Sequence, residues 1–321
     1  MKTLAVLLLI AAAPAAHAQD VYPSRSIQMI IPFAAGSAGD VALRIVTAKM
    51  ATLLGKPIVI ENVTGAAGII GAERVARAAP DGYTIIGMGD SVVTTVPILN
   101  KNVKYDPFRD FELVCQVVNF EWVLVTNPSF PAKNVQELVA LAKAKPGTID
   151  FSSGGNGSPQ HIAMEMLEAK TGIKLAHVPY RGATAALTDV VAGTVPLTFT
   201  AIAVAEPFIR SGKVRVLGTG GPKRAASLPD VPTVAEEGVP GFAWSTWNSI
   251  MLPKGTPAAI IDTLHKAVVT ALKDDDVKAR LANVGVVPNG NTPAEFKANL
   301  AKSYAEMAEL IKNAGITMEE K

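Results

Sequence analysis

Residues 30–40 read IIPFAAGSAGD, where an apolar, strand-like segment runs into small residues and a helical pattern follows at once. The same succession of strand, small residues and helix recurs in the second half of the chain, where residues 150–160 read DFSSGGNGSPQ. Around both stretches, short apolar runs alternate with segments of helical period, which is typical of an α/β protein. We therefore predict two α/β lobes, each a mostly parallel sheet flanked by helices.

The length of the chain also favours two lobes. A single hydrophobic core stops growing near ~250 to 300 residues, and this chain has 321 residues, of which 49% are hydrophobic. We place the first lobe at residues 19–121 and 247–321 and the second at residues 122–246. The segments near residues 119–125 and 247–252 are expected to cross between the lobes as two strands of a hinge.

The first 18 residues have the pattern of a secretory signal peptide. Lys2 supplies a positive charge, residues 4–13 are apolar, and Ala16 and Ala18 form a small-residue cleavage signal. The apolar run is shorter than the roughly 20 residues that a spanning helix needs. We expect cleavage after Ala18 and an exported protein.

Composition and motifs argue against several functions. The chain has 30 Lys and Arg against 28 Asp and Glu, a formal net charge of +2, and it lacks the basic, aromatic-rich clusters of nucleic-acid binding proteins. Gly36 to Gly39 lack the third glycine of a dinucleotide fingerprint, and residues 154–159 lack the Gly-Lys-Ser/Thr of a P-loop. We predict no cofactor and no nucleic-acid partner. Cys115 is the one cysteine, and we expect it in the core.

Signals for catalysis and metal binding are weak as well. The sequence has no G-x-S-x-G or H-E-x-x-H motif. His161, His177 and His265 are too scattered to suggest a metal cluster. His161 could donate to a ligand or be satisfied by local backbone, and we assign structural roles to the other two. Because no nucleophile is paired with a base, we do not expect an enzyme, and a secreted hydrolase of carboxylate esters is an alternative.

The two glycine loops are candidates for an anion site. Glycine tolerates positive φ, and the first N–H groups of a helix lack internal partners and carry partial positive charge. A single strand-glycine-helix turn is often a plain connection, but one in each half could hold a carboxylate across a cleft. Asp40 is expected to cap or begin its helix rather than bind. Pro159 suits a first helical turn after a cap at Ser158 or Asn156.

Several segments resemble one family. IIPFAAGSAGDV, APDGYT, HVPYRG and LPDVPT follow in order along the chain, which is similar to the Bug family, the extracytoplasmic solute receptors of tripartite tricarboxylate transporters. The resemblance covers essentially everything after the leader. It implies a periplasmic, two-lobed Venus-flytrap protein of type II fold, without enzymatic activity. Such a receptor captures a small carboxylate and delivers it to a two-subunit integral membrane permease, and we expect a monomer.

The resemblance also implies which residues bind. A ligand carboxylate would be held by backbone N–H groups and ordered water at the two loops, at Phe33, Ala34, Ala35, Gly36 and Ser37 in the first lobe and at Ser153, Gly154, Asn156, Gly157 and Ser158 in the second. The loop from Tyr180 onward would form another wall, in which Arg181 could pair with a second carboxylate or make a plain salt bridge. Thr184 and Thr200 are candidate hydroxyl donors.

Further side chains leave the ligand open between a dicarboxylate, an aromatic acid and an acidic amino acid. Asp90 and Ser91 should lie at the cleft rim, where Asp90 could bind a ligand ammonium or cap a helix. Trp122, Trp244 and Trp247 could stack on an aromatic acid or pack the hinge. Binding would favour closure of the two lobes. A ligand sensor for a membrane kinase would use the same site and is a further alternative.

Overall fold

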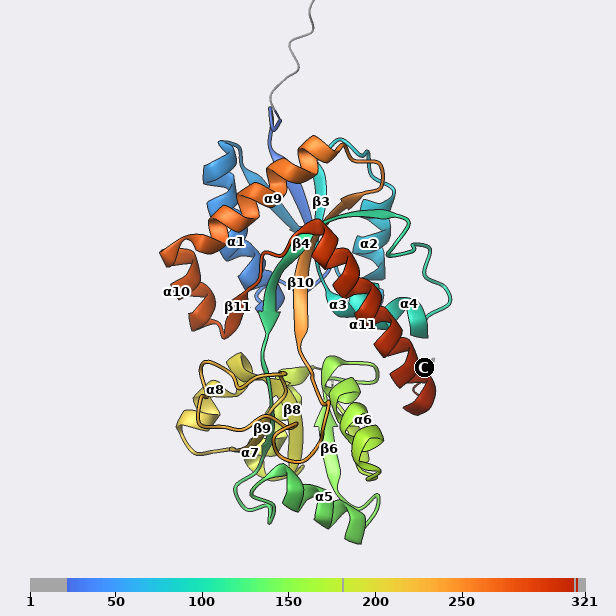
Figure 1. Ribbon diagram of the computed structural model, residues 1–321, viewed down its shortest axis with the longest axis vertical. Coiled ribbons are helices and arrows are strands. Elements are labelled where there is room, and N and C mark those ends of the chain that lie inside the picture. Colours follow the sequence, from blue (N-terminus) through green and yellow to red (C-terminus); the bar gives the residue numbers. More distant parts are fainter. Residues whose placement is uncertain (1–21, 181, 315, 317–321) are drawn as a thin grey trace, which may run out of the picture.

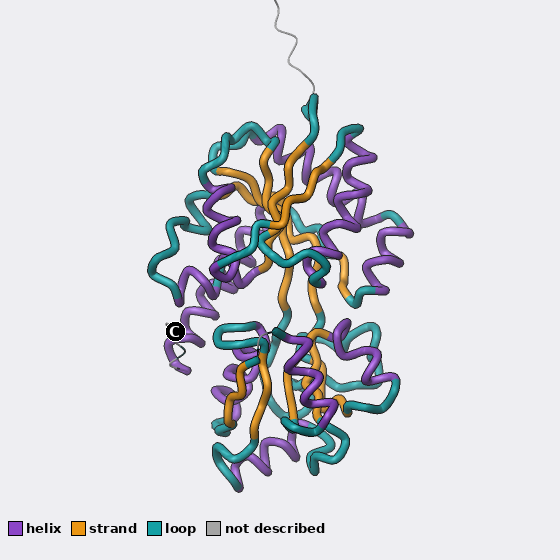
Figure 2. The backbone as a smooth tube through the Cα atoms, turned by 180° about the vertical axis from the view of Figure 1, so that it is seen from behind, coloured by secondary structure: helices purple, strands orange, loops and turns teal. Residues whose placement is uncertain are grey.

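The structure is a computed structural model that describes residues 22–180, 182–314 and 316. The predicted signal peptide and Arg181 therefore lie outside the described residues. Two β-sheets, each flanked by helices, follow one another along the long axis of the molecule and are connected by two extended crossings (Figure 1). The view from behind shows the same two crossings between the two parts (Figure 2). Within the described ranges, no helix is long and apolar enough to cross a membrane.

Lobe 1 is built on a six-stranded sheet of order β11-β4-β10-β3-β1-β2. Its strands are β1 (Ile27–Ile31), β2 (Ile58–Asn62), β3 (Thr84–Gly89), β4 (Phe111–Phe120), β10 (Thr246–Pro253) and β11 (Val286–Pro288). Its helices are α1 (Ala38–Leu54), the 3-10 turn η1 (Ala66–Gly68), α2 (Ile69–Ala76), α3 (Asp90–Val93), α4 (Thr95–Leu99), α9 (Ala258–Lys273), α10 (Asp275–Asn283) and α11 (Pro293–Ala314).

Lobe 2 is built on a five-stranded sheet of order β7-β6-β8-β5-β9. Its strands are β5 (Trp122–Thr126), β6 (Asp150–Ser153), β7 (Ala176–Pro179), β8 (Leu197–Ala201) and β9 (Arg215–Thr219). Its helices are α5 (Val135–Ala144), α6 (Pro159–Thr171), α7 (Ala183–Ala192) and α8 (Ile202–Arg210). Helix α8 was not predicted from the sequence.

Both sheets are mixed, which corrects the prediction of mostly parallel sheets. β1 pairs in parallel with β2 and β3, and β6 pairs in parallel with β7 and β8. β10, however, lies antiparallel between β3 and β4, and β5 lies antiparallel between β8 and β9. The reason is that β5 and β10 each enter their sheet from the other lobe, so they run against neighbours that end at the cleft.

The hinge consists of the two places where the chain changes sheets. Only Glu121 separates β4 from β5, and β10 brings the chain back to lobe 1. The indole N–H of Trp122 donates to the hydroxyl of Thr246 at 3.0 Å and ties the two crossings together. We propose on this basis that the lobe boundaries fall at residues 121/122 and 246/247.

Local sequence signals account for the helices that begin at the cleft. Ser37 caps α1, and Gly55 ends it in the left-handed conformation with φ 66°. Leu43 and Met50 recur on one face of α1 and are fully buried. Cys115 is fully buried in β4, so its predicted place in the core is confirmed.

Candidate functional site

A cavity of about 490 Å³ lies between the lobes, and we call it the cleft cavity. Lobe 1 contributes the start of α1, the end of β3 and part of the hinge, with Phe33, Gly36, Ser37, Ala38, Gly39, Gly89, Asp90, Ser91, Phe120, Trp247 and Asn248, and Thr246 lies at the boundary between the lobes. Lobe 2 contributes the starts of three helices and the end of β8, with Trp122, Pro159, Gln160, Ala183, Thr184, Thr200, Ala201 and Val204. The site is thus made where strands end and helices begin in both lobes.

A second cavity of about 460 Å³ adjoins the first, and we call it the loop cavity because both glycine loops line it. It shares Phe33, Ser91 and Pro159 with the cleft cavity. Most of the predicted site residues line one of the two cavities, namely Phe33, Gly36, Ser37, Asp90, Ser91, Thr184 and Thr200 on the cleft cavity and Ala34, Asn156, Gly157 and Ser158 on the loop cavity.

The remaining predicted residues that the structure describes line neither cavity. They are Ala35, Ser153, Gly154, His161 and Tyr180. Tyr180 is instead engaged within lobe 2, where its hydroxyl donates to Oδ2 of Asp189 at 2.6 Å. The pKa of Tyr180 is raised to about 12 by this hydrogen bond and by burial. The hydroxyl of Tyr180 is therefore committed to the protein.

The loop before α1 is closed by a buried carboxylate. Ser37 caps the helix by accepting from the N–H of Asp40, and Oδ2 of Asp40 accepts from the N–H of Gly36 at 2.9 Å. Arg44 Nε and Asn62 Nδ2 each donate to Asp40 at 2.8 Å. Burial opposes ionisation, but the hydrogen bonds from Arg44, Asn62 and Gly36 lower the pKa of Asp40 overall. Asp40 therefore holds the loop rather than a ligand.

The loop before α6 repeats this arrangement with an imidazole. Ser158 is the cap and Pro159 takes the first helical position. The N–H of Gly157 donates to Nδ1 of His161 at 3.1 Å, and Nε2 of His161 lies 3.4 Å from Oε1 of Glu165. Because Nδ1 accepts, the ring is neutral and its proton is on Nε2, facing the carboxylate.

The backbone N–H groups of the two glycine loops were predicted to be free to bind a ligand. This prediction is wrong at four positions, because the N–H groups there already donate within the protein: Gly36, Ser37, Gly157 and Ser158. Gly36 and Gly157 donate to Asp40 and His161. The N–H groups of Ser37 and Ser158 donate to the carbonyls of Ala34 and Gly155, three residues back in the same turns. The glycine loops are therefore satisfied turns that shape the cavity walls.

Two other helix N-termini, which have no side-chain cap, line the cleft cavity. Neither α7 nor α8 has a side chain that caps its N-terminus. Ala183 and Thr184 of α7, and Ala201 and Val204 at the start of α8, line the cleft cavity. The first amides of a helix carry partial positive charge and favour an anion. At α8 the first amide, that of Ile202, donates to the carbonyl of Glu121 at 2.9 Å, so an anion would meet the start of α7 and the amides after Ile202 in α8.

Two buried polar side chains in the cleft cavity also lack partners. Thr200 Oγ1 and Asn248 Nδ2 have no hydrogen bond to any part of the chain that the structure describes. Asn248 lies against two glycines: a Cβ at Gly39 would be 2.7 Å from its Nδ2, and one at Gly89 would be 3.2 Å from its Oδ1. An unpaired buried polar group is costly. A polar ligand would remove that cost at both positions.

Asp90 is the first residue of α3 and not its cap, which corrects one of the two expectations for it. The capping position belongs to Gly89, and Oδ1 of Asp90 accepts from the N–H of Ser91 at 2.9 Å. Burial raises the pKa of Asp90 to about 7, and the backbone hydrogen bonds only partly offset this effect. The cleft therefore contains a carboxyl group that titrates near neutral pH.

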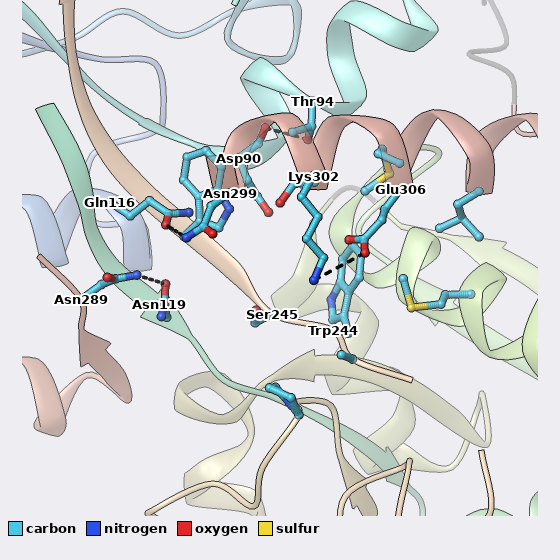
Figure 3. Close-up of a pocket in the computed structure, with 17 residues that line it drawn as sticks. Asp90, Thr94, Gln116, Asn119, Trp244, Ser245, Asn289, Asn299, Lys302 and Glu306 are labelled. Atoms are coloured by element: carbon cyan, nitrogen blue, oxygen red, sulfur yellow. Dashed lines mark hydrogen bonds and ion pairs between the residues drawn. The ribbon is translucent and has the colours of Figure 1, made fainter. Parts of the chain in front are cut away.

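The three tryptophans lie around the cleft and the hinge. Trp122 and Trp247 line the cleft cavity, and Trp247 also lines a cavity at the hinge. Trp244 packs edge to face on Trp122 at 6.3 Å and lines a third cavity of about 280 Å³ under α11, which we call the hinge cavity (Figure 3). Sequence reasoning missed Phe120 and Asn248, although both belong to the segments it expected to cross at the hinge.

One pair contradicts the prediction that no nucleophile meets a base. Oγ of Ser153 lies 2.6 Å from Nε2 of His177, and the N–H of Gly155 donates to the same Oγ. Burial and the neighbouring His161 lower the pKa of His177 to about 4. Ser153 is fully buried and reaches neither cavity, so the pair secures the turn after β6. Among the described residues, no group of His, Cys, Asp and Glu could hold a metal ion.

Solved structures with this architecture define the class of protein. BugD, a periplasmic binding protein, is 34% identical with a TM-score of 0.78, over 92% of this chain and 99% of that one. An R. palustris protein solved with adipate is 30% identical with a TM-score of 0.81, over 92% and 99% of the two chains. MatC from Rhodopseudomonas palustris, solved with malate, is 31% identical with a TM-score of 0.77, over 90% and 100%. The predicted two-lobed periplasmic-binding-protein fold is confirmed.

Sequence comparison gives the family. The model of the tripartite tricarboxylate transporter family receptor matches residues 42–316. BugT of Bordetella pertussis is 34% identical over 297 residues, which cover 92% of this chain and 91% of that protein. The chain belongs to this family of solute receptors, and the resemblance to the Bug family is confirmed.

Proposed function

We propose that this protein is a periplasmic receptor that captures a small organic carboxylate between its lobes and delivers it to a two-subunit membrane permease. The family is one of solute-binding receptors rather than enzymes. Two related structures contain adipate and malate, which are both dicarboxylates. The leader-like first 18 residues and the periplasmic relatives support export to the same compartment.

The observation that carries this proposal is the group of helix starts in the cleft cavity. The starts of α7 and α8, which have no side-chain cap, line it from lobe 2, and Thr200 Oγ1 near the end of β8 has no partner among the described residues. From the hinge, Asn248 Nδ2 offers a further unpaired donor. A carboxylate has the charge and the acceptor atoms that these groups need.

Closure of the lobes is the proposed mechanism of capture. A ligand bound to α7 and α8 of lobe 2 can also contact Ser37 or Asn248 of lobe 1, which line the same cavity. Contacts made only when both lobes meet the ligand favour the closed form by that difference in affinity. No covalent step is required, and the permease would recognise the closed receptor.

The substitution Ala183→Asp tests the site with little risk to folding. Ala183 is the first residue of α7, where a negative charge stabilises a helix, but the new carboxylate would repel a ligand carboxylate in the cavity. We expect at least a tenfold loss of affinity, which corresponds to about 1.4 kcal/mol. Ala183→Asn, of the same shape without the charge, is the control and should bind more tightly than Ala183→Asp.

The measurement is a thermal-shift screen followed by calorimetry. The probes are adipate, malate, succinate, glutarate, aspartate, glutamate and benzoate, because a ligand that binds only the native state raises the melting temperature. Equal affinities of both variants and the wild type for a confirmed ligand would place the carboxylate elsewhere. No shift with any carboxylate would count against the proposed function itself.

A further inference from the structure

Asp90 occupies an unusual place between two cavities. It lines the cleft cavity at the end of β3 and also lines the hinge cavity under α11, where it lies across from Lys302 and Glu306 (Figure 3). It is the one charged residue among the described residues that line the cleft cavity. Any charged group on a ligand in the cleft would therefore meet a carboxyl group of the protein at this wall.

No cation of the described chain neutralises Asp90. Its carboxylate accepts from the backbone N–H of Ser91, and no ion pair to it occurs within the described residues. The cation that lines the hinge cavity with Asp90 is Lys302, whose Nζ lies 3.9 Å from Oε1 of Glu306 and whose side chain is 75% exposed. Among the described residues of lobe 2, those on the wall of the cleft cavity are uncharged, such as Gln160 and Thr184. A half-buried carboxylate without a cationic partner is unfavourable.

We propose that Asp90 pairs with a positively charged group on the ligand, so that this receptor selects a carboxylate that also carries an ammonium group, such as an amino acid. This inference rests on the proposed function and names the ligand class within it. The cavity would then hold a ligand with two ends: its carboxylate at the starts of α7 and α8, and its ammonium at Asp90. The rings of Phe33, Trp122 and Trp247 line the same space and can face a cation.

The two ends fall on different lobes, which connects selectivity to closure. Asp90 belongs to lobe 1, whereas α7 and α8 belong to lobe 2. A plain monocarboxylate would satisfy lobe 2 alone, and a plain dicarboxylate would bring a second negative charge toward Asp90. An amino acid would meet complementary charge on both lobes and would favour the closed form more strongly.

The test compares matched ligands on two variants. Succinate and aspartate, and glutarate and glutamate, differ by one ammonium group, and calorimetry at pH 8 gives their affinities. In the wild type, we expect each amino acid to bind at least tenfold more tightly than its dicarboxylate. Asp90→Asn keeps the shape and an acceptor for Ser91, and it should lose or reverse this preference. Asp150→Asn, at an exposed residue at the start of β6, removes the same charge far from the cleft and should keep the preference.

The pH dependence gives a second readout. Because burial raises the pKa of Asp90 to about 7, the ionised partner of an ammonium becomes available as the pH rises from 6 to 8. Aspartate should therefore bind several-fold more tightly to the wild type at pH 8 than at pH 6, with little change in Asp90→Asn. Since a carboxyl with a raised pKa stabilises the fold less as the pH rises through that value, Asp90→Asn without ligand should also melt at a higher temperature than the wild type at pH 8.

The possible failures are distinguishable. If succinate binds the wild type as tightly as aspartate, and Asp90→Asn changes neither affinity, the inference about Asp90 is wrong while the proposed carboxylate receptor stands. If dicarboxylates bind better below pH 7, a protonated Asp90 donates to them, and the ammonium assignment is also wrong. If neither class of ligand binds the wild type, the proposed function fails and the inference fails with it.

Discussion

The two glycine loops of this protein have nearly the same geometry, but different side chains accept the hydrogen bond that closes each loop. Gly36 and Gly157 have φ of 80° and 71°, and the serine caps that follow them have ψ of 157° in both loops. In each, the side chain at the third helical position accepts the N–H of the glycine four residues earlier. That acceptor is a carboxylate at Asp40 and an imidazole at His161.

This difference determines the charge of the group that accepts in each loop. The pKa of Asp40 is lowered, so its contribution to stability is present above about pH 4 and is lost only as the pH falls through that lowered value. In lobe 2, the acceptor is an imidazole nitrogen of His161. The turn in lobe 1 therefore depends on a charged acceptor that also binds Arg44, whereas the turn in lobe 2 depends on a ring nitrogen.

The largest expected effect comes from removing the acceptor in lobe 1. Asp40→Ala leaves the N–H of Gly36 and the side-chain amide of Asn62 without their acceptor and leaves Arg44 without its ion-pair partner. We expect the free energy of unfolding to fall by about 2–3 kcal/mol, toward the lower end of the cost of breaking a buried pair because Arg44 reaches solvent. Urea unfolding at pH 7 measures this change. A loss below about 0.5 kcal/mol would mean that the loop does not depend on Asp40.

The matching change in lobe 2 should be smaller. His161→Ala removes the acceptor of Gly157 and the ring that stacks on His177 with centroids 4.0 Å apart. Because, among the described residues, His161 accepts from Gly157 alone, whereas Asp40 accepts from Gly36, Arg44 and Asn62, we expect a smaller loss of about 1–2 kcal/mol in the same unfolding experiment. A loss in the free energy of unfolding equal to that of Asp40→Ala would show that the two acceptors stabilise the protein equally.

Amide hydrogen exchange at pH 7 tests whether each loop depends on its own acceptor. Asp40→Ala should reduce the protection of the Gly36 amide and leave that of the Gly157 amide unchanged, because each amide donates to one of these side chains. His161→Ala should have the opposite effect. Loss of protection at both glycines in either variant would refute the contrast.

The smallest expected effect concerns the caps that the two loops share. Ser37 and Ser158 each accept from the amide at the third helical position at 3.4 Å. Ser37→Ala and Ser158→Ala should each cost about 0.5–1 kcal/mol, and the two losses should be similar. Unequal losses would show that the loops differ beyond Asp40 and His161.

The features predicted correctly depend on residues close together in the chain. The alternation of strands and helices, and the roles of Ser158 and Pro159 at the start of α6, follow from the pattern within about ten residues. The burial of Cys115 follows from its apolar surroundings in β4. Helix α8 was missed because it follows β8 without a polar cap or a glycine, and the N–H of Ile202 instead donates to the carbonyl of Glu121 at 2.9 Å, far away in the sequence.

Most of the predicted site residues line cavities between the lobes, but four of the predicted backbone donors are already occupied. Both glycine loops border the cavities between the lobes, but whether an amide is open depends on its partner. Asp40 and His161 lie only four residues from the glycines, so a reading of the third helical position as an acceptor could have found them. Nothing local indicates that Asn248 lies between Gly39 and Gly89 with an unpaired Nδ2.

By itself, the sequence determined the class of fold, the family and the two loops, because periodicity, caps and glycines act over a few bonds. The tertiary structure decided which groups remain available to a ligand. It brought α7, α8, Thr200, Asn248 and Asp90 to one cavity from segments of the chain that are far apart. Hydrogen bonds and desolvation depend on neighbours in space, so the chemistry of this site exists only once the chain has folded.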